Sequence, residues 1–309
     1  MRIVFFGNGA FGVPALQALA QSIHEVVAVI TNPDRPAGRG YHPTPTPIKE
    51  TAQKLGLPVW EVPSPRDSAL PDRLRSLEAH AFIVIAYRIL PRTIWEIPPF
   101  GALNLHPSLL PAYRGPAPIP WTIIHGETET GLSIFRIDEG IDTGSLLWQE
   151  KYPLPETWTA GELESFLAEV GARAILQVLE GLALGTLQPF PQPEMPDPPY
   201  APKLTPSNTR INWEKSARAI YNFIRALYPQ PLAWTTFHEK RLHILQAIPH
   251  HLRTLHTAPG TLYFDKDRLL VTCGEGVLEI LQLRLEGRKT MNGTAFAHGF
   301  LKKQVLQLV

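Results

Sequence analysis

The sequence has a single cysteine, Cys273, among its 309 residues, so no intrachain disulfide can form. Long apolar runs are also lacking, because none approaches the ~18 residues that a membrane-spanning helix needs. The N-terminal run MRIVFF stops at Gly7, which is too short for the core of a signal peptide and predicts a buried strand. These absences predict a soluble protein of a reducing compartment, with no membrane partner, and we expect it in the cytoplasm.

The spacing of a metal site is also missing. No two histidines stand four residues apart, and the one cysteine has no second thiol to share a metal with. His250 and His251 are adjacent, so they cannot share one face of a helix. The remaining candidates are scattered along the chain: His24, Asp34, His42 and His125. We therefore expect no metal.

Net charge is nearly absent overall, but it is unevenly divided. Residues 1–206 carry 15 Lys/Arg and 21 Asp/Glu, a net of −6, whereas residues 207–309 carry 14 Lys/Arg and 7 Asp/Glu, a net of +7. Six of the eleven histidines also lie in the basic part. A basic C-terminal third favours contact with a polyanion, and nucleic acid is the first candidate. Charge alone is equally compatible with an idle basic surface.

The first half of the chain alternates short apolar runs with helical patterns. The predicted strands are residues 2–6, 26–31, 81–86 and 101–105. A helix is predicted at residues 14–20, and Thr159 with Glu162 forms a capping box for another that runs to about residue 180. Residues 81–86 are apolar throughout, as in a strand covered on both faces. The order predicts an α/β fold with a doubly wound, mostly parallel sheet.

Eight prolines fall within residues 189–206. Proline lacks the amide donor of a ladder or helix interior, so this stretch predicts a stiff interdomain linker. We expect a catalytic N-terminal domain at residues 1–188 and a C-terminal domain at residues 207–309. The latter begins with an amphipathic helix and continues in short β-like segments, which predicts a small β-barrel. Its helix has one apolar face: Ala217, Ile220, Ile224 and Leu227.

Residues 7–12 read Gly-Asn-Gly-Ala-Phe-Gly, between a predicted strand and a predicted helix. The G-x-G-x-x-G pattern is typical of dinucleotide binding, and it raises the alternative of a dehydrogenase. Such a site needs an acidic residue at the end of the second strand. Asp34 instead sits in a proline-bounded loop, where it is poorly placed for a ribose. A tight turn that requires glycine is the favoured interpretation.

Polar residues gather at the end of the predicted strand 101–105. Asn104 and His106 are two residues apart, so both side chains project from one face, and Pro107 ends the strand after them. The C-terminal edge of a parallel sheet is where ligands bind. The glycine-punctuated acidic loop at residues 138–144 can bring Asp142 beside His106.

These three residue types suit acyl transfer to an amine. The amide of Asn104 can donate a hydrogen bond to a developing oxyanion, and His106 can relay a proton from the attacking amine. The carboxylate of Asp142 can orient the imidazole and raise its basicity. A strand-end asparagine, a hydrogen-bonded histidine and an Asx-turn aspartate are the structural alternative. The three residues alone leave both interpretations open.

Residues 104–111, Asn-Leu-His-Pro-Ser-Leu-Leu-Pro, resemble the signature of the folate-dependent formyltransferases, and Asp142-Thr143-Gly144 follows at that family's usual distance. The match is closest to the branch of the family that acts on charged initiator tRNA. Its loop, interdomain and C-terminal signatures have counterparts here: residues 34–40, 200–203, 224–227 and 286–291. The resemblance therefore spans nearly the whole chain.

The resemblance implies 10-formyltetrahydrofolate as the formyl donor and the α-amino group of methionine on initiator tRNA as the acceptor. It implies Asn104, His106 and Asp142 as the catalytic residues. We expect a monomer. The C-terminal domain is implied to be an oligonucleotide-binding-type (OB-like) barrel that holds tRNA, which agrees with its positive charge. The implied folate-pocket residues are Tyr87, Arg88, Ile89, Leu90, Ser108, Leu109, Leu110 and Pro111. The implied tRNA contacts are Arg35 and Arg39, and Tyr41 is a further expected contact.

Two positions depart from the family pattern. Lysines usually continue the loop after Gly40, but Tyr41 and His42 stand here, followed by three prolines. Tyr41 is therefore expected to stack on a base where the electrostatic grip is weaker. Arg88 replaces a common glycine, so its side chain either points to solvent or narrows the folate entrance.

Other functions fit part of the sequence. Glycinamide ribonucleotide formyltransferase shares the strand-end residues, but it needs no basic barrel and lacks the loop at residues 34–40. A sugar-nucleotide formyltransferase is a similar alternative. A nucleic-acid-binding module with an inactive front domain is disfavoured by the intact Asn104, His106 and Asp142. A dehydrogenase built on residues 7–12 is the least favoured.

Overall fold

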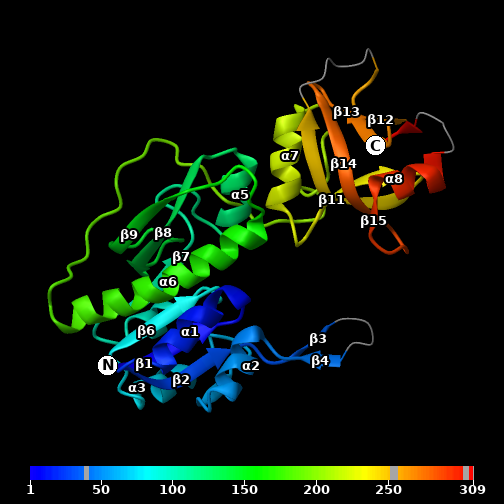
Figure 1. Ribbon diagram of the computed structural model, residues 1–309. Helices are drawn as coiled ribbons and strands as arrows, with labels where there is room; N and C mark the ends of the chain where they lie inside the picture. Colours follow the sequence, from blue (N-terminus) through cyan, green and yellow to red (C-terminus); the bar gives the residue numbers. More distant parts are fainter. Residues whose placement is uncertain (38–41, 251–256, 302–305, 309) are drawn as a thin grey trace. The chain divides into compact units, whose positions relative to one another are not determined.

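The computed structural model describes residues 1–37, 42–250, 257–301 and 306–308 (Figure 1). The chain divides into two compact units. Unit 1 comprises Met1–Pro118, Glu129–Pro153 and Glu164–Tyr200, and unit 2 comprises Ile119–Thr128, Leu154–Leu163 and Ala201–Val309. In the described part of the chain, no helix is both long and apolar enough to cross a membrane.

Unit 1 is built on a mixed seven-stranded sheet of order β5-β2-β1-β6-β7-β8-β9. The strands are β1 (Arg2–Gly7), β2 (Glu25–Thr31), β5 (Val59–Glu61), β6 (Ala81–Ile85), β7 (Ala102–His106), β8 (Glu129–Arg136) and β9 (Leu146–Pro153). The five strands from β5 to β7 are parallel, whereas β8 and β9 are antiparallel. The predicted doubly wound, mostly parallel α/β sheet is confirmed. Every residue of β6 is buried, as its apolar run predicts.

The helical segments of unit 1 are η1 (Ala10–Gly12), α1 (Val13–Ala20), α2 (Pro47–Lys54), α3 (Leu70–Arg75), α4 (Arg92–Trp95) and most of α6 (Ala160–Ala183). The capping box that begins α6 is confirmed, since Thr159 N and Thr159 Oγ1 both donate to Glu162 Oε2, at 2.8 and 2.7 Å. Gly171 of α6 packs against Leu105 of β7 so closely that a Cβ there would lie 2.5 Å from Leu105 Cδ2. Because side chains alternate along a strand, Asn104 and His106 face away from α6.

Unit 2 contains a second seven-stranded sheet, of order β10-β11-β14-β13-β12-β16, with β15 paired to β14. Its strands are β10 (Ala233–Phe237), β11 (Lys240–His250), β12 (Thr261–Asp265), β13 (Arg268–Thr272), β14 (Val277–Leu285), β15 (Met291–Asn292) and β16 (Leu306–Gln307). All neighbouring strands are antiparallel, and the sheet is barrel-like, as expected. Its helical segments are α5 (Pro118–Ile124, from Ile119 on), α7 (Ala217–Ala226), α8 (Gly293–Phe296) and the π-helical turn η2 (Ala297–Leu301).

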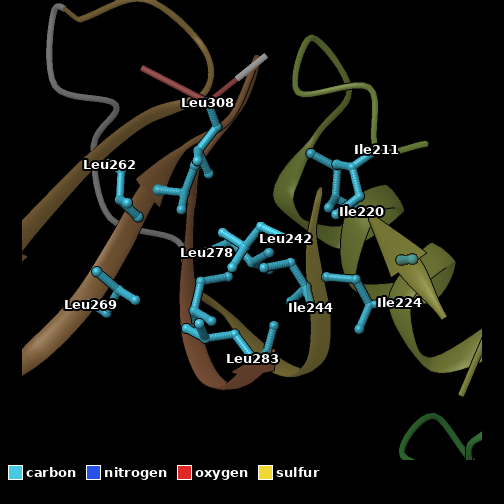
Figure 2. Close-up of a cluster of buried hydrophobic side chains, with 14 of the residues drawn as sticks. Ile211, Ile220, Ile224, Leu242, Ile244, Leu262, Leu269, Leu278, Leu283 and Leu308 are labelled. Atoms are coloured by element: carbon cyan, nitrogen blue, oxygen red, sulfur yellow. The ribbon is translucent and has the colours of Figure 1, made fainter. Parts of the chain in front are cut away.

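Helix α7 supplies one wall of the core of unit 2. Ser216 caps it by accepting a hydrogen bond from Ala219 N at 3.2 Å. Ile220 and Ile224 point from α7 toward Leu242 and Ile244 of β11, as Figure 2 shows. The predicted amphipathic helix is therefore present and packs its apolar face onto the sheet.

Two short segments that precede the proline-rich stretch belong to unit 2. Trp121 Nε1 donates to Pro202 O at 2.7 Å, and Arg225 Nη1 donates to Trp158 O at 2.7 Å. The division between the units falls between Tyr200 and Ala201, inside the proline-rich stretch. These units cut the chain differently from the domain limits at residues 188 and 206, which stay a prediction.

Candidate active site

Strand β7 carries two of the predicted catalytic residues. It lies between β6 and β8, with Asn104 opposite Val84 and Phe135 and with His106 opposite Ser133. His106, the last residue of the strand, is 6% exposed. The buried neighbouring strands therefore fix the backbone from which both side chains project.

The carbonyl of Tyr113 fixes the imidazole of His106. His106 Nε2 lies 2.9 Å from Tyr113 O. A carbonyl only accepts hydrogen bonds, so Nε2 carries a proton and Nδ1 is the free nitrogen of the neutral ring. Nδ1 lies 3.7 Å from Asp142 Oδ2, within the range of an ion pair. The structure therefore brings His106 and Asp142 together, and it adds a backbone group, Tyr113 O, that the sequence did not indicate.

Asp142 lies in the loop between β8 and β9, in a left-handed conformation with φ of 55°. Its Oδ2 accepts a hydrogen bond from Gly115 N at 2.9 Å. Asp138 makes the Asx turn of this loop, because Asp138 Oδ1 accepts from Gly140 N at 3.0 Å and from Thr143 Oγ1 at 2.6 Å. The side chain of Asp142 is thus free of the turn and faces His106.

The amide of Asn104 is available for a ligand. Asn104 is half-buried, and its side chain makes no hydrogen bond among the residues that the structure describes. It projects from the same face of β7 as His106. An unengaged amide beside a proton-accepting imidazole can stabilise a negative oxygen while the imidazole moves a proton.

The loop after β7 is held largely by internal contacts. Ser108, 1% exposed, donates through Oγ to Ala112 O at 2.7 Å, and Ser133 Oγ donates to Ser108 O at 2.7 Å. Leu110 packs with Phe135 and Leu146. The Leu110–Pro111 bond is cis, and Pro111 is buried. Of the four predicted folate contacts here, only Leu109 is half-buried, and the other three shape the loop.

The second predicted folate loop follows β6. Tyr87 packs edge-on against Phe6, with ring centroids 5.5 Å apart, and burial raises the pKa of its hydroxyl. Arg88 donates from Nη1 to Pro63 O, which decides where its side chain goes: it turns toward that carbonyl. Leu90 is 4% exposed, whereas Ile89 is 78% exposed. Ile89 is therefore the apolar side chain that this loop offers to a ligand.

The glycine turn at residues 7–12 joins two strand ends. Asn8 Oδ1 accepts from Thr31 Oγ1 at 3.2 Å and from Asn32 N at 2.9 Å. Asp34, the residue that a ribose contact would use, is instead paired with Lys49 Nζ at 2.7 Å. The arrangement fits a structural turn rather than a dinucleotide site.

Of the three predicted tRNA contacts, the structure describes Arg35. Arg35 is exposed on β3 (Arg35–Ala37), which pairs with β4 (His42–Thr44) in a hairpin. Arg39 and Tyr41 fall outside the described residues. Within the described ranges, no group of three or more His, Cys, Asp or Glu side chains could hold a metal ion.

The family follows from comparison with known proteins. A model of the formyl transferase domain matches residues 1–179, and a model of the formyl transferase C-terminal domain matches residues 203–301. This chain belongs to the formyl transferase family. Both matches together cover the strand-end site of unit 1 and the sheet of unit 2 except β16, so the family assignment extends over both units.

Relatives of similar length exist within the formyl transferase family. Methionyl-tRNA formyltransferase of Porphyromonas gingivalis is 40% identical, over 97% of this chain and 96% of its own. The enzyme of that name from Acidobacterium capsulatum is 42% identical over the same shares.

Solved structures share the fold. HypX from Aquifex aeolicus in complex with tetrahydrofolic acid has a TM-score of 0.68 at 20% identity, over 98% of this chain and 48% of its own. The present chain therefore spans about half the length of HypX. An N-formyltransferase from Helicobacter canadensis has a TM-score of 0.67 at 19% identity, over 90% of this chain and 97% of its own.

Proposed function

We propose that this protein transfers the formyl group of 10-formyltetrahydrofolate to the α-amino group of methionine on initiator methionyl-tRNA, giving N-formylmethionyl-tRNA for translation initiation. The observation that carries the proposal is the identity of about 40% to methionyl-tRNA formyltransferases over 97% of the chain. Because that likeness includes unit 2, it concerns the acceptor as well as the formyl-transfer chemistry. A cytoplasmic monomer is part of the same proposal.

His106 is the residue that moves the proton. When the amine nitrogen bonds to the formyl carbon, the bond from that carbon to the folate nitrogen breaks, and the amine proton must reach the folate nitrogen. Nδ1 of His106 accepts this proton, because Nε2 is already engaged with Tyr113 O. The carboxylate of Asp142, 3.7 Å away, stabilises the imidazolium until the proton is passed on.

Asn104 stabilises the charge that develops on the formyl oxygen. Its side-chain amide donates a hydrogen bond to that oxygen as the amine adds to the carbon. One such positioned donor contributes about 10²- to 10³-fold in rate. A backbone fixed between β6 and β8 keeps this donor in place before the substrates arrive.

The loops after β6 and β7 are the proposed folate pocket. The residues assigned to it are Tyr87, Arg88, Ile89, Leu90, Ser108, Leu109, Leu110 and Pro111. The exposed Ile89 and the half-buried Leu109 provide apolar contact for flat rings, while the buried Ser108 and Leu110 hold the shape of the loop. The bound donor supplies the activated formyl carbon.

Unit 2 presents a surface that suits RNA. The guanidinium groups of Arg210 and Arg241 lie over the ring of Trp234, at 5.5 and 4.4 Å from its centroid. Across β10, β11 and β14, Trp234 pairs with His243 and His243 pairs with Arg284, so one row of this face is aromatic and basic. Exposed cations that neutralise phosphates and a ring that stacks on a base are the features of a nucleic-acid contact. Arg35, Arg39 and Tyr41 are the proposed tRNA contacts of unit 1.

Acceptor competition tests the proposal. The protein is incubated with 10-formyltetrahydrofolate labelled in the formyl group, Met-charged initiator tRNA and glycinamide ribonucleotide together. We expect the label on the methionyl-tRNA and none on the ribonucleotide. Label on glycinamide ribonucleotide alone would make glycinamide ribonucleotide formyltransferase the correct assignment.

A further inference from the structure

Residues 190–200 of the proline-rich stretch contact the start of β9, next to the loop that carries Asp142, and the loop after β7. At one end, Phe190 and Leu146 exchange two backbone hydrogen bonds of 2.7 and 2.8 Å. At the other end, Tyr113 N donates to Pro199 O at 2.6 Å, so the residue whose carbonyl holds His106 is itself held by this stretch. A segment that serves only as a spacer between domains has no need of these contacts.

Gln192 is set apart from its neighbours by burial and by hydrogen bonds. In the run of residues 188–197, all of them described, every residue except Gln192 is exposed. Gln192 Nε2 donates to Asp142 O at 2.8 Å and to Gly144 O at 3.0 Å. The two carbonyls can only accept, so the orientation of this amide is fixed by its chemistry.

Arg114 completes the contact from the other side. Its Nη2 donates to Gln192 Oε1 at 2.5 Å, and its Nε donates to Asp142 O at 3.1 Å. The carbonyl of Asp142 thus accepts from two side chains, one on the loop after β7 and one on the proline-rich stretch.

The backbone at Asp142 needs such support. A left-handed conformation costs a residue other than glycine about 1–2 kcal/mol, and it persists where the surroundings fix it. Gly144 packs closely against the backbone of β8, since a Cβ there would lie 1.8 Å from Arg136 O. Asp138 holds one side of the loop and Gln192 with Arg114 hold the other. These contacts hold the Asp142 peptide, while Gly115 N holds its carboxylate directly by donating to Oδ2 at 2.9 Å.

We propose that Gln192 is a positioning residue for proton transfer. Through its Nε2 donor, and with Arg114, it holds the Asp142 peptide so that Oδ2 faces Nδ1 of His106. The proline-rich stretch is thereby part of the active site. This inference rests on the proposed function for its kinetic test, but its geometric test does not.

The kinetic test compares three variants. Gln192→Ala removes the whole contact, and Gln192→Glu keeps the length and the acceptor for Arg114 but loses the Nε2 donor. Gln188→Ala removes an exposed glutamine that directly precedes the proline-rich stretch. We expect both Gln192 variants to lower kcat by about 10- to 100-fold, as for a misplaced reacting group, with KM for either substrate changed less than about threefold. The Gln188 variant should match the wild type. A Gln192→Glu enzyme with wild-type kcat would overturn the proposal.

A double-mutant cycle shows whether Gln192 acts through Asp142. In an Asp142→Asn background, the further change Gln192→Ala should lower kcat less than about twofold, because the interaction it supports is already lost. A full additional loss would mean that Gln192 acts elsewhere. If the wild-type enzyme and the Gln188→Ala variant both fail to formylate methionyl-tRNA, the proposed function is refuted instead. That outcome is distinct from a loss of rate confined to the Gln192 variants.

A crystal structure of the Gln192→Ala variant tests the geometry without any substrate. We expect the distance between Asp142 Oδ2 and His106 Nδ1 to lengthen beyond the 3.7 Å seen here. An unchanged loop and an unchanged distance would refute the positioning role, whatever the acceptor proves to be.

Discussion

The two units differ in where they keep their polar side chains. Unit 1 buries His106, proposed to move the proton, and Ser108 of the loop after β7, which are 6% and 1% exposed, and each has a hydrogen-bond partner. Unit 2 has a largely aliphatic core (Figure 2), and the cations Arg210, Arg241 and Arg284 lie on its surface. Buried, fixed groups suit proton transfer, whereas exposed charges suit a salt-dependent grip on a polyanion. The contrast fits the proposal that unit 1 carries out catalysis and unit 2 binds the acceptor.

The largest expected effect is on the rate of formyl transfer, which we assign to unit 1. His106→Ala and Asn104→Ala should each lower the rate of formyl transfer by about 10²-fold or more, because each removes one positioned proton-transfer or oxyanion group. The measurement is single-turnover formylation at saturating tRNA and folate. Near wild-type rates in both variants would remove the assigned roles.

Arg225 is a buried charged residue in unit 2, unlike the exposed Arg210, Arg241 and Arg284. Its replacement should have the next largest effect, on the free energy of unfolding. It is 6% exposed, it donates to Asn222 Oδ1 and Trp158 O, and burial lowers its pKa. Arg225→Met should lower the free energy of unfolding by about 2 kcal/mol, since hydrogen bonds of a charged group are lost and their partners stay buried.

Arg218→Met on the same helix is the matched control. Arg218 is exposed and forms a surface ion pair with Glu156, so its loss should cost less than about 1 kcal/mol. Urea unfolding of both variants measures the difference. Equal midpoints would mean that the buried contact of Arg225 adds nothing to stability.

A smaller effect is expected on the tRNA affinity that we assign to unit 2. Arg241→Ala should weaken tRNA binding a few-fold and reduce the slope of log K against log salt by about one, without changing the rate at saturating tRNA. Arg66→Ala, which removes an exposed cation from unit 1, is the control. Binding measured by filter retention at several salt concentrations gives the slopes. Identical slopes for wild type and Arg241→Ala would remove this surface from the interface.

The smallest effect concerns the core of unit 2. Burial raises the pKa of the Cys273 thiol to about 12 from its ordinary 9. The folded protein therefore retains this proton where the unfolded chain loses it, so the stabilising contribution is complete below pH 9 and is lost as the pH rises toward 12. At pH 8 a thiol reagent should label Cys273 only at the rate of unfolding. Rapid labelling of the native protein would contradict the burial.

Local patterns in the sequence predicted much of unit 1. The strand predicted at residues 101–105 corresponds to β7 (Ala102–His106), which places Asn104 and His106 two residues apart. The predicted capping box at Thr159 is also present, although Thr159 belongs to unit 2. The sequence also placed Asp142 near His106, and the two lie 3.7 Å apart.

Long-range contacts were beyond the sequence. The carbonyl of Tyr113 is a backbone group without a residue signature, and Gln192 reaches Asp142 across fifty positions of chain. The composition of the proline-rich stretch predicts a linker, and it carries no signal for the hydrogen bonds of Gln192 to the loop of Asp142. The same limit applies to Trp121 and Trp158, whose grouping with unit 2 depends on contacts with Pro202 and Arg225.

Measuring rate and affinity in the same two variants tests whether catalysis and tRNA binding are divided between the two units. For His106→Ala and Arg241→Ala, the single-turnover rate at saturating tRNA and the dissociation constant for Met-charged initiator tRNA are determined in parallel. We expect that His106→Ala lowers the rate by about 10²-fold and keeps its affinity for tRNA, while Arg241→Ala loses affinity and keeps its rate. A comparable loss of rate and affinity in both variants would contradict the division of catalysis and tRNA binding between the two units.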